Sequence, residues 1–116
     1  ARFARLLLDV GSKYVHHLGK AEIGAPLLER ALAIKEREYG PEHREVAVTL
    51  NNLGNAHGAL GDAAKKRNLL ERALAIFERE YGSDHPHAVY CREQLESQEA
   101  QKVDQSSLPE ATETVN

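Results

Sequence analysis

The chain has 116 residues and a net charge of −3, with 28% charged and 41% hydrophobic residues, which is the composition of a single globular domain. Aromatic residues make up only 5% and tryptophan is absent, so Leu, Ala, Val and Ile must build the core, which favours closely packed helices. The slight negative charge gives no reason to expect nucleic acid as a partner. No apolar run approaches the roughly 20 residues that span a bilayer, so we expect no membrane insertion.

Cysteine usage and the start of the chain bear on its compartment. Cys91 is the single cysteine, which excludes an internal disulfide and is compatible with a reducing compartment. The run Leu6–Leu8 is too short for a secretory signal, so we expect a cytoplasmic location. The chain has no methionine, so we expect a trimmed initiator, a removed targeting segment with an organellar location, or a fragment of a longer chain.

Apolar residues recur at three- and four-residue spacings and predict helices in chain order. The predicted helices cover residues 3–17, 21–38, 44–60, 63–80 and 86 to about 103. Tyr39-Gly40 and Tyr81-Gly82 are predicted to end the second and fourth helices, because glycine readily adopts the left-handed conformation just past a helix end. Asp84 or His85 is expected to cap the fifth helix. Residues 104–116 have the composition of a polar, flexible tail.

A long internal repeat organises these helices. The octet Leu27–Ile34 returns 42 residues later, letter for letter, as Leu69–Ile76. Residues 27–54 and 69–96 are identical at 15 of 28 positions. A fixed period of this size is typical of repeat arrays. Because a single helix pair cannot bury its apolar face alone, neighbouring pairs must stack into a continuous core.

The repeat resembles the tetratricopeptide repeat (TPR), in the roughly 42-residue variety of kinesin light chains. Features of the first and third predicted helices and of the two connectors carry this resemblance. They are Leu50, Leu53-Gly54 and His57 in the third helix, Leu7, Val10-Gly11 and Tyr14 in the first, the segment Thr49–Gly54, and the connectors Gly40–His43 and Gly82–Pro86.

The resemblance implies an all-α fold, an α–α superhelix of two helix-turn-helix repeats followed by a capping helix. The implied domain covers residues 1–103, with repeats at about 4–43 and 44–85, a capping helix at about 86–103, and a tail at 104–116. Glu96 and Glu99 stand where the family has a small residue and an aromatic one, so we read the fifth helix as a polar cap. Lys66 replaces a family alanine, and its ammonium must reach solvent along the aliphatic stem.

The resemblance also implies a non-catalytic protein-interaction module that binds a peptide or protein face in the concave groove of its first helices. The residues that this assigns to the groove are Arg5, Ser12 and His16 from the first helix, Asn51 and Asn55 from the third, and Tyr90, Glu93, Gln94 and Ser97 from the fifth. A purely structural role for the asparagines is a comparable alternative. The alternative function is an accessory subunit of a larger assembly, in which a neighbour covers Phe3 and Leu6.

Other chemistry is disfavoured. His43 and His85 recur with the repeat, so loop and cap hydrogen bonding explains them better than metal binding, and we expect no metal or other cofactor. Cys91 is expected to be a small core residue rather than a reactive thiol. The basic run Lys65–Arg67 is expected to be an exposed helix start rather than an anion site. We therefore expect no enzymatic activity.

Overall fold

The computed structural model describes the backbone of residues 2–115 and the side chains of residues 2–101. This part of the chain forms five helices, namely α1 (Arg2–His16), α2 (Ala21–Tyr39), α3 (Arg44–Ala59), α4 (Ala63–Tyr81) and α5 (Pro86–Val115). The bounds of α1 to α4 agree with the predicted ranges to within one residue at each end. The all-α solenoid expected from the sequence is confirmed.

The end of α5 differs from the prediction. The helix continues to Val115 instead of ending near residue 103. No glycine follows Gly82 in the sequence, so α5 lacks the residue that ends α2 and α4, and glutamate, glutamine and alanine are good helix formers. The side chains beyond residue 101 lie outside the described part, so a separate polar tail stays a prediction.

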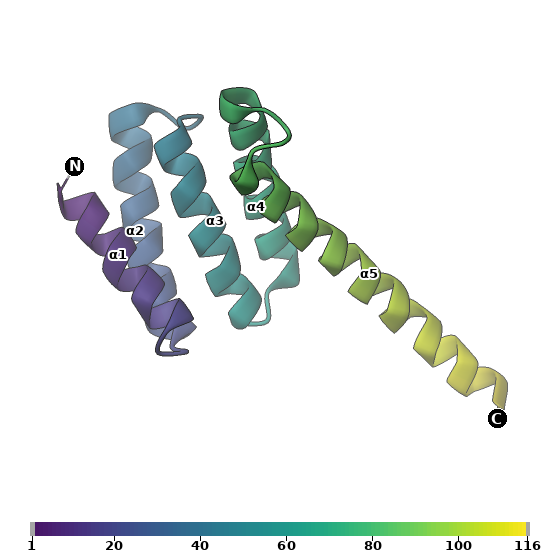
Figure 1. Cartoon of the computed structure of the whole chain (residues 1–116). Helices are drawn as coiled ribbons and strands as arrows, with labels where there is room; N and C mark the ends of the chain where they lie inside the picture. Colours follow the sequence, from purple (N-terminus) through teal and green to yellow (C-terminus); the bar gives the residue numbers. More distant parts are fainter. Residues whose placement is uncertain (1, 116) are drawn as a thin grey trace.

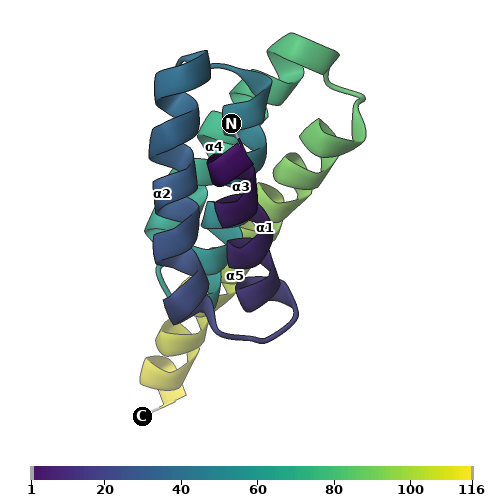
Figure 2. The ribbon, with the colours of Figure 1, turned by 90° about the vertical axis from the view of Figure 1, so that its left-hand side faces the viewer.

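The helices form two layers (Figures 1 and 2). Helices α1, α3 and α5 make one layer, and α2 and α4 make the other, with consecutive helices antiparallel. The core lies between the layers and is centred on the fully buried side chains of Leu28, Leu50, Leu53, Leu70 and Phe77. The octet repeat supplies part of this core, with Leu28 and Ala31 from α2 and Leu70 and Ala73 from α4.

A stacked tyrosine–histidine pair closes each repeat. The rings of Tyr39 and His43 lie 4.6 Å apart and those of Tyr81 and His85 lie 4.3 Å apart, both nearly parallel. In the sequence, a glycine with positive φ follows the tyrosine of each pair; φ is 89° at Gly40. Glycine adopts this conformation without steric cost. The turn that the sequence predicted at these positions is therefore confirmed.

The same two histidines start the next helices. His43 Nδ1 accepts a hydrogen bond from the backbone N–H of Glu45 at 3.0 Å, and His85 Nδ1 accepts one from the N–H of His87 at 3.2 Å. Each imidazole thus satisfies a backbone donor that a helix start leaves without a partner. The structure selects His85 over Asp84 as the cap of α5 and confirms that both repeated histidines are structural.

Candidate peptide-binding surface

The nine residues that the sequence assigned to a binding groove all lie on α1, α3 and α5, the helices of one layer (Figure 1). We call this side of the molecule the first-helix surface. None of the nine is buried. Arg5, His16, Tyr90, Glu93 and Ser97 are exposed, and Ser12, Asn51, Asn55 and Gln94 are half-buried. All nine are therefore in contact with solvent.

The structure brings the predicted residues of α3 and α5 together. The hydroxyl of Tyr90 donates to Oδ1 of Asn55 at 3.4 Å, and the thiol of Cys91 lies 3.9 Å from Oδ1 of Asn51. Both contacts use the amide oxygen, so the hydrogen bonds among the described side chains leave the two NH2 groups free to donate. An asparagine NH2 carries two donors, which can bind the carbonyl oxygens of a peptide backbone.

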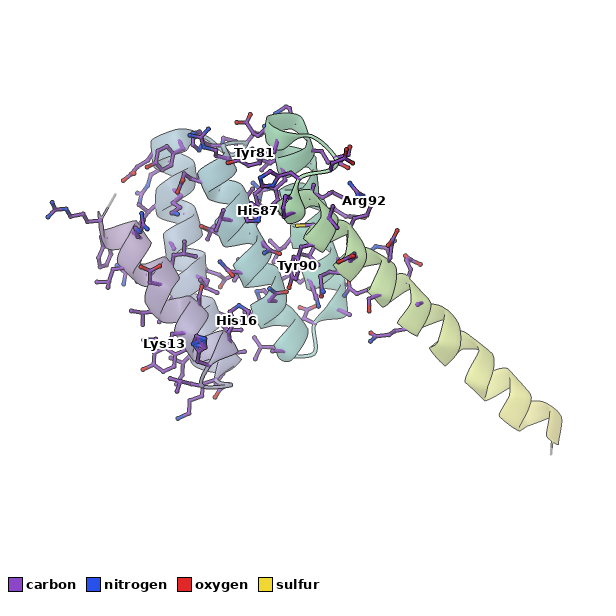
Figure 3. All side chains as sticks on the ribbon, in the orientation of Figure 1. Lys13, His16, Tyr81, His87, Tyr90 and Arg92 are labelled. Carbon is purple, nitrogen blue, oxygen red and sulfur yellow. The ribbon has the colours of Figure 1, made fainter. Side chains whose placement is uncertain are left out.

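The predicted residues of α1 stand apart from this pair. Among the described residues, no hydrogen bond or ion pair links Arg5, Ser12 or His16 to the asparagines of α3. Figure 3 shows His16 towards the end of α1 and Tyr90 across α3, on the α5 side. The polar contacts of the first-helix surface thus centre on α3 and α5, and α1 borders them.

Lys66 belongs to α4, in the other layer, but its side chain reaches the first-helix surface, which the sequence did not predict. Its Nζ donates to Oε1 of Gln94 at 3.3 Å, and its stem lies against Gly58, where an added Cβ would be 2.7 Å from Lys66 Cδ. The sequence predicted that the ammonium reaches solvent along its stem; in the structure the stem lies along α3 and the ammonium binds Gln94. Gly58 was the available signal, because a position without a side chain on α3 leaves room for the lysine.

The rest of the basic run is engaged locally. Lys65 Nζ lies 3.4 Å from a carboxylate oxygen of Glu29, which is also 3.9 Å from Nε2 of His57. Arg67 pairs with Glu99 at 2.6 Å and, more loosely, with Glu71. These acidic partners support the expectation that the run is an ordinary helix start rather than an anion site.

A hollow of about 670 Å³ lies between the N-terminal half of α4 and α5, away from the predicted groove. Its lining exposes more apolar than polar surface, although most of the residues are polar: they are Ala63, Ala64, Arg67, Asn68, Glu71, Gln98, Glu99 and Gln101. Gln98 donates from Nε2 to the carbonyl oxygen of Ala63 at 3.1 Å, which ties α5 to the start of α4. No sequence pattern indicated this hollow, because it arises from the angle at which α5 diverges from α4 (Figure 1).

Cys91 lies in the core. Its side chain is fully buried, and burial raises the pKa of the thiol to about 11, because the thiolate would lose its hydration. The interpretation of Cys91 as a core residue is confirmed. Within the described residues, no group of three or more His, Cys, Asp or Glu side chains is placed to hold a metal ion. None of the helices has, over the same residues, an apolar stretch long enough to cross a bilayer.

Comparison with known proteins agrees with this architecture. One family model described as tetratricopeptide repeat matches residues 2–65, and a second of the same description matches residues 46–87. The curated proteins returned no match. The first match covers more than half of the chain and the two together span α1 to the start of α5. The chain therefore belongs to the tetratricopeptide repeat family, whose repeats generally serve in protein–protein interaction.

Proposed function

We propose that this protein is a non-catalytic interaction module that holds an extended peptide on its first-helix surface, between α3 and α5. The observation that carries the proposal is the pairing of Asn51 and Asn55 with α5 through their amide oxygens alone. That arrangement orients the amides and leaves their NH2 groups available as donors. Lys66, beside Gln94, adds a positive charge at the same place.

The chemistry of this surface suits a peptide backbone better than a reacting group. Amide NH2 donors bind carbonyl oxygens, and the exposed ring of Tyr90 offers an apolar face on which a side chain of the ligand can pack. The Lys66 ammonium favours a carbonyl or carboxylate next to the peptide segment. We therefore expect the ligand to be an extended segment with an acidic or amide side chain near Gln94.

The test is a double substitution, Asn51→Ala with Asn55→Ala, in the full chain. Peptides selected from a random library on the wild-type protein would be measured against the double variant by fluorescence anisotropy. We expect a loss of affinity of at least tenfold with unchanged helicity. Asn68→Ala is the matched control, because Asn68 is an exposed asparagine on α4, in the other layer. Equal binding to wild type and the double variant would remove the proposal.

A second candidate function is that of an accessory subunit in a larger assembly. The exposure of Phe3 and Leu6 on α1 favours it, since contiguous apolar side chains on a surface mark interaction sites. An isolated chain that is monomeric, melts cooperatively and stays soluble at high concentration would count against this candidate. Analytical ultracentrifugation and thermal melting measure these properties.

A further inference from the structure

Lys66 carries a half-buried charge that has no carboxylate partner among the described side chains. Its ammonium donates to the neutral Oε1 of Gln94 at 3.3 Å. Lys35 and Lys65, by contrast, each pair with a glutamate, at 3.3 and 3.4 Å. An ammonium has three donors, so Lys66 keeps two that the described side chains do not use.

The packing of the helices does not require a lysine at this position. The stem of Lys66 fills the space beside Gly58 of α3, where an added Cβ would be 2.7 Å from Lys66 Cδ. At the equivalent contact of α1 with α2 the sizes are exchanged: the second helix supplies the glycine, Gly24, and Val15 of the first helix fills the space. A Cβ added at Gly24 would be 2.6 Å from a methyl carbon of Val15. A side chain without charge therefore satisfies this contact, and packing does not explain the ammonium.

The surroundings leave the charge of Lys66 uncompensated. Glu93 precedes Gln94 on α5, but consecutive residues of a helix do not face the same way, and Glu93 is exposed. Lys66 also belongs to the first turn of α4, where the positive end of the helix dipole disfavours a cation. The position thus costs stability as long as no anion is bound beside the ammonium.

The ammonium lies next to the contacts of the asparagines on which the proposed function depends. On α5, Gln94 comes four residues after Tyr90, which bonds Asn55. On α3, Gly58 comes three residues after Asn55. Each step is about one helical turn, or about 5.4 Å, and successive residues of an extended peptide are about 3.3 Å apart. A ligand side chain one or two residues from the carbonyl that Asn55 binds therefore comes within reach of Lys66.

We infer that Lys66 makes the first-helix surface select a peptide with an acidic side chain at this place over the same peptide with the corresponding amide. The inference rests on the proposed function. A carboxylate accepts from the two remaining donors through charge-assisted hydrogen bonds, which are about twice as strong as neutral ones. An amide oxygen repeats the neutral contact that Gln94 already makes, and it leaves a partly desolvated cation without a counter-charge.

The test uses the peptides selected on the wild-type protein, with their acidic residues changed one at a time to the corresponding amide. Fluorescence anisotropy measures the binding of each peptide pair to the full chain. We expect one of these changes to weaken binding to the wild type about tenfold, and binding to Lys66→Met by less than about twofold. Lys66→Glu should reverse the preference. Lys65→Met, at the preceding residue, is the matched control and should keep it, because Lys65 pairs with Glu29 instead.

Gly58→Ala tests the same inference without removing the charge. The added methyl group takes the space of the Lys66 stem, so the flexible lysine side chain must turn away from Gln94. The preference for the acidic peptide should therefore fall, although the protein keeps its ammonium. Thermal melting of the variants separates this role from a structural one. Lys66→Met should melt no lower than the wild type, because it removes a charge that lacks a carboxylate partner.

Other results would overturn the inference. Selected peptides without an acidic residue, or an acid-to-amide change that weakens binding equally in wild type and Lys66→Met, would show that Lys66 selects nothing, while the asparagine site would stand. A Lys66→Met variant that melts well below the wild type, with a preference that Gly58→Ala leaves unchanged, would assign the lysine a structural role. If the Asn51→Ala, Asn55→Ala variant binds the selected peptides like the wild type, the proposed function fails and the inference fails with it.

Discussion

The ammonium of Lys35 lies 3.3 Å from a carboxylate oxygen of Glu45 and joins α2 to α3. The lysine side chain is buried and the glutamate is half-exposed. In the next repeat, 42 residues later, the same two positions hold Phe77 and His87, whose rings lie 4.9 Å apart. One junction of the array is thus held by an ion pair and the equivalent junction by an aromatic pair.

Lys35→Met should leave the stability unchanged or raise it by up to about 1 kcal/mol, because replacing a buried charge by an apolar side chain of similar length is often neutral or favourable. Glu45 keeps its access to water in that variant. Lys35→Ala should cost about 2 kcal/mol, since it also removes the buried methylene groups. Urea unfolding measures both changes. Lys13→Met, at an exposed lysine, is the control.

The aromatic junction offers a stricter comparison. The double variant Lys35→Phe, Glu45→His transplants the second junction into the first and should be at least as stable as wild type. The argument fails if Lys35→Met loses as much stability as Lys35→Ala, because the loss of the charge would then account for the whole cost. It also fails if the transplanted pair loses more than about 2 kcal/mol, the cost of an ill-fitting core substitution.

The sequence predicted the helices well because the signals were local. These signals are the Tyr-Gly helix ends, the histidine caps and the apolar residues at three- and four-residue spacings. Each acts within one or two helical turns, and the helix ends and caps occur in both copies of the repeat. The family assignment followed from the same residues. The predicted end of α5 was wrong because it relied on the polar composition of residues 104–116, which contain no glycine to end the helix.

The candidate surface was predicted less completely. The resemblance to the tetratricopeptide repeat assigned nine residues to the first helices, and all nine lie on that layer, while their role in binding stays a prediction. The contacts of Asn51 and Asn55 with α5, and the reach of Lys66 to Gln94, depend on the angles between helices. Those angles arise from the packing of residues distant in sequence, which a pattern along one helix does not contain.

The contribution of the histidine caps to stability can be measured separately from that of the stacking on tyrosine. His43→Asn keeps a side-chain acceptor for the N–H of Glu45 but loses the stack on Tyr39, whereas His43→Phe keeps the stack and loses the acceptor. Loss of a cap costs about 1 kcal/mol, and loss of an aromatic contact costs about 0.5–1.5 kcal/mol. We expect each variant to lose about 1 kcal/mol and His43→Ala to lose about the sum.

Thermal and urea unfolding of the three variants gives these values. The equivalent substitutions at His85 should behave alike, since His85 stacks on Tyr81 and accepts from His87 in the same way. If His43→Ala were no worse than either single-function variant, one of the two contacts would contribute nothing to stability.

Cys91 should make stability fall at alkaline pH. Its thiol has a pKa of about 11 in the folded protein, raised by burial from 9.0. Between these values the unfolded chain loses a proton that the folded chain keeps, so rising pH favours unfolding by up to about 1.4 kcal/mol per pH unit. The stability that the protonated thiol maintains in the folded protein is therefore fully present below about pH 9 and is lost by about pH 11.

The check compares wild type with Cys91→Thr, because threonine occupies the equivalent buried position 49. Urea unfolding across pH 8–11 should show a steeper loss for wild type, and the difference isolates the thiol from tyrosines and lysines that titrate in the same range. The folded thiol should also resist iodoacetamide until urea unfolds the chain. Rapid alkylation under native conditions would contradict the buried position.

Glycine-to-alanine substitutions should change stability in opposite directions at two buried glycines, Gly24 where α2 packs on α1 and Gly54 where α3 packs on α4. A Cβ added at Gly24 of α2 would lie 2.6 Å from the carbonyl oxygen of Gly11 on α1, and backbone cannot move away without separating the helices. At Gly54 of α3 the nearest atom would be Cγ of Leu70 at 3.4 Å, which is ordinary contact. We therefore expect Gly24→Ala to destabilise by about 1–3 kcal/mol, the usual cost of overpacking.

Gly54→Ala should stabilise by about 0.5–1 kcal/mol, because alanine restricts the unfolded chain and favours the helix. Both glycines are buried in helices, so the two variants share the same gain in helix propensity and differ in the space available. Thermal melting of the two variants measures both changes in stability. A stabilised Gly24→Ala variant would mean that α1 and α2 can separate at no cost, and a destabilised Gly54→Ala variant would mean that α3 and α4 pack more closely than 3.4 Å implies.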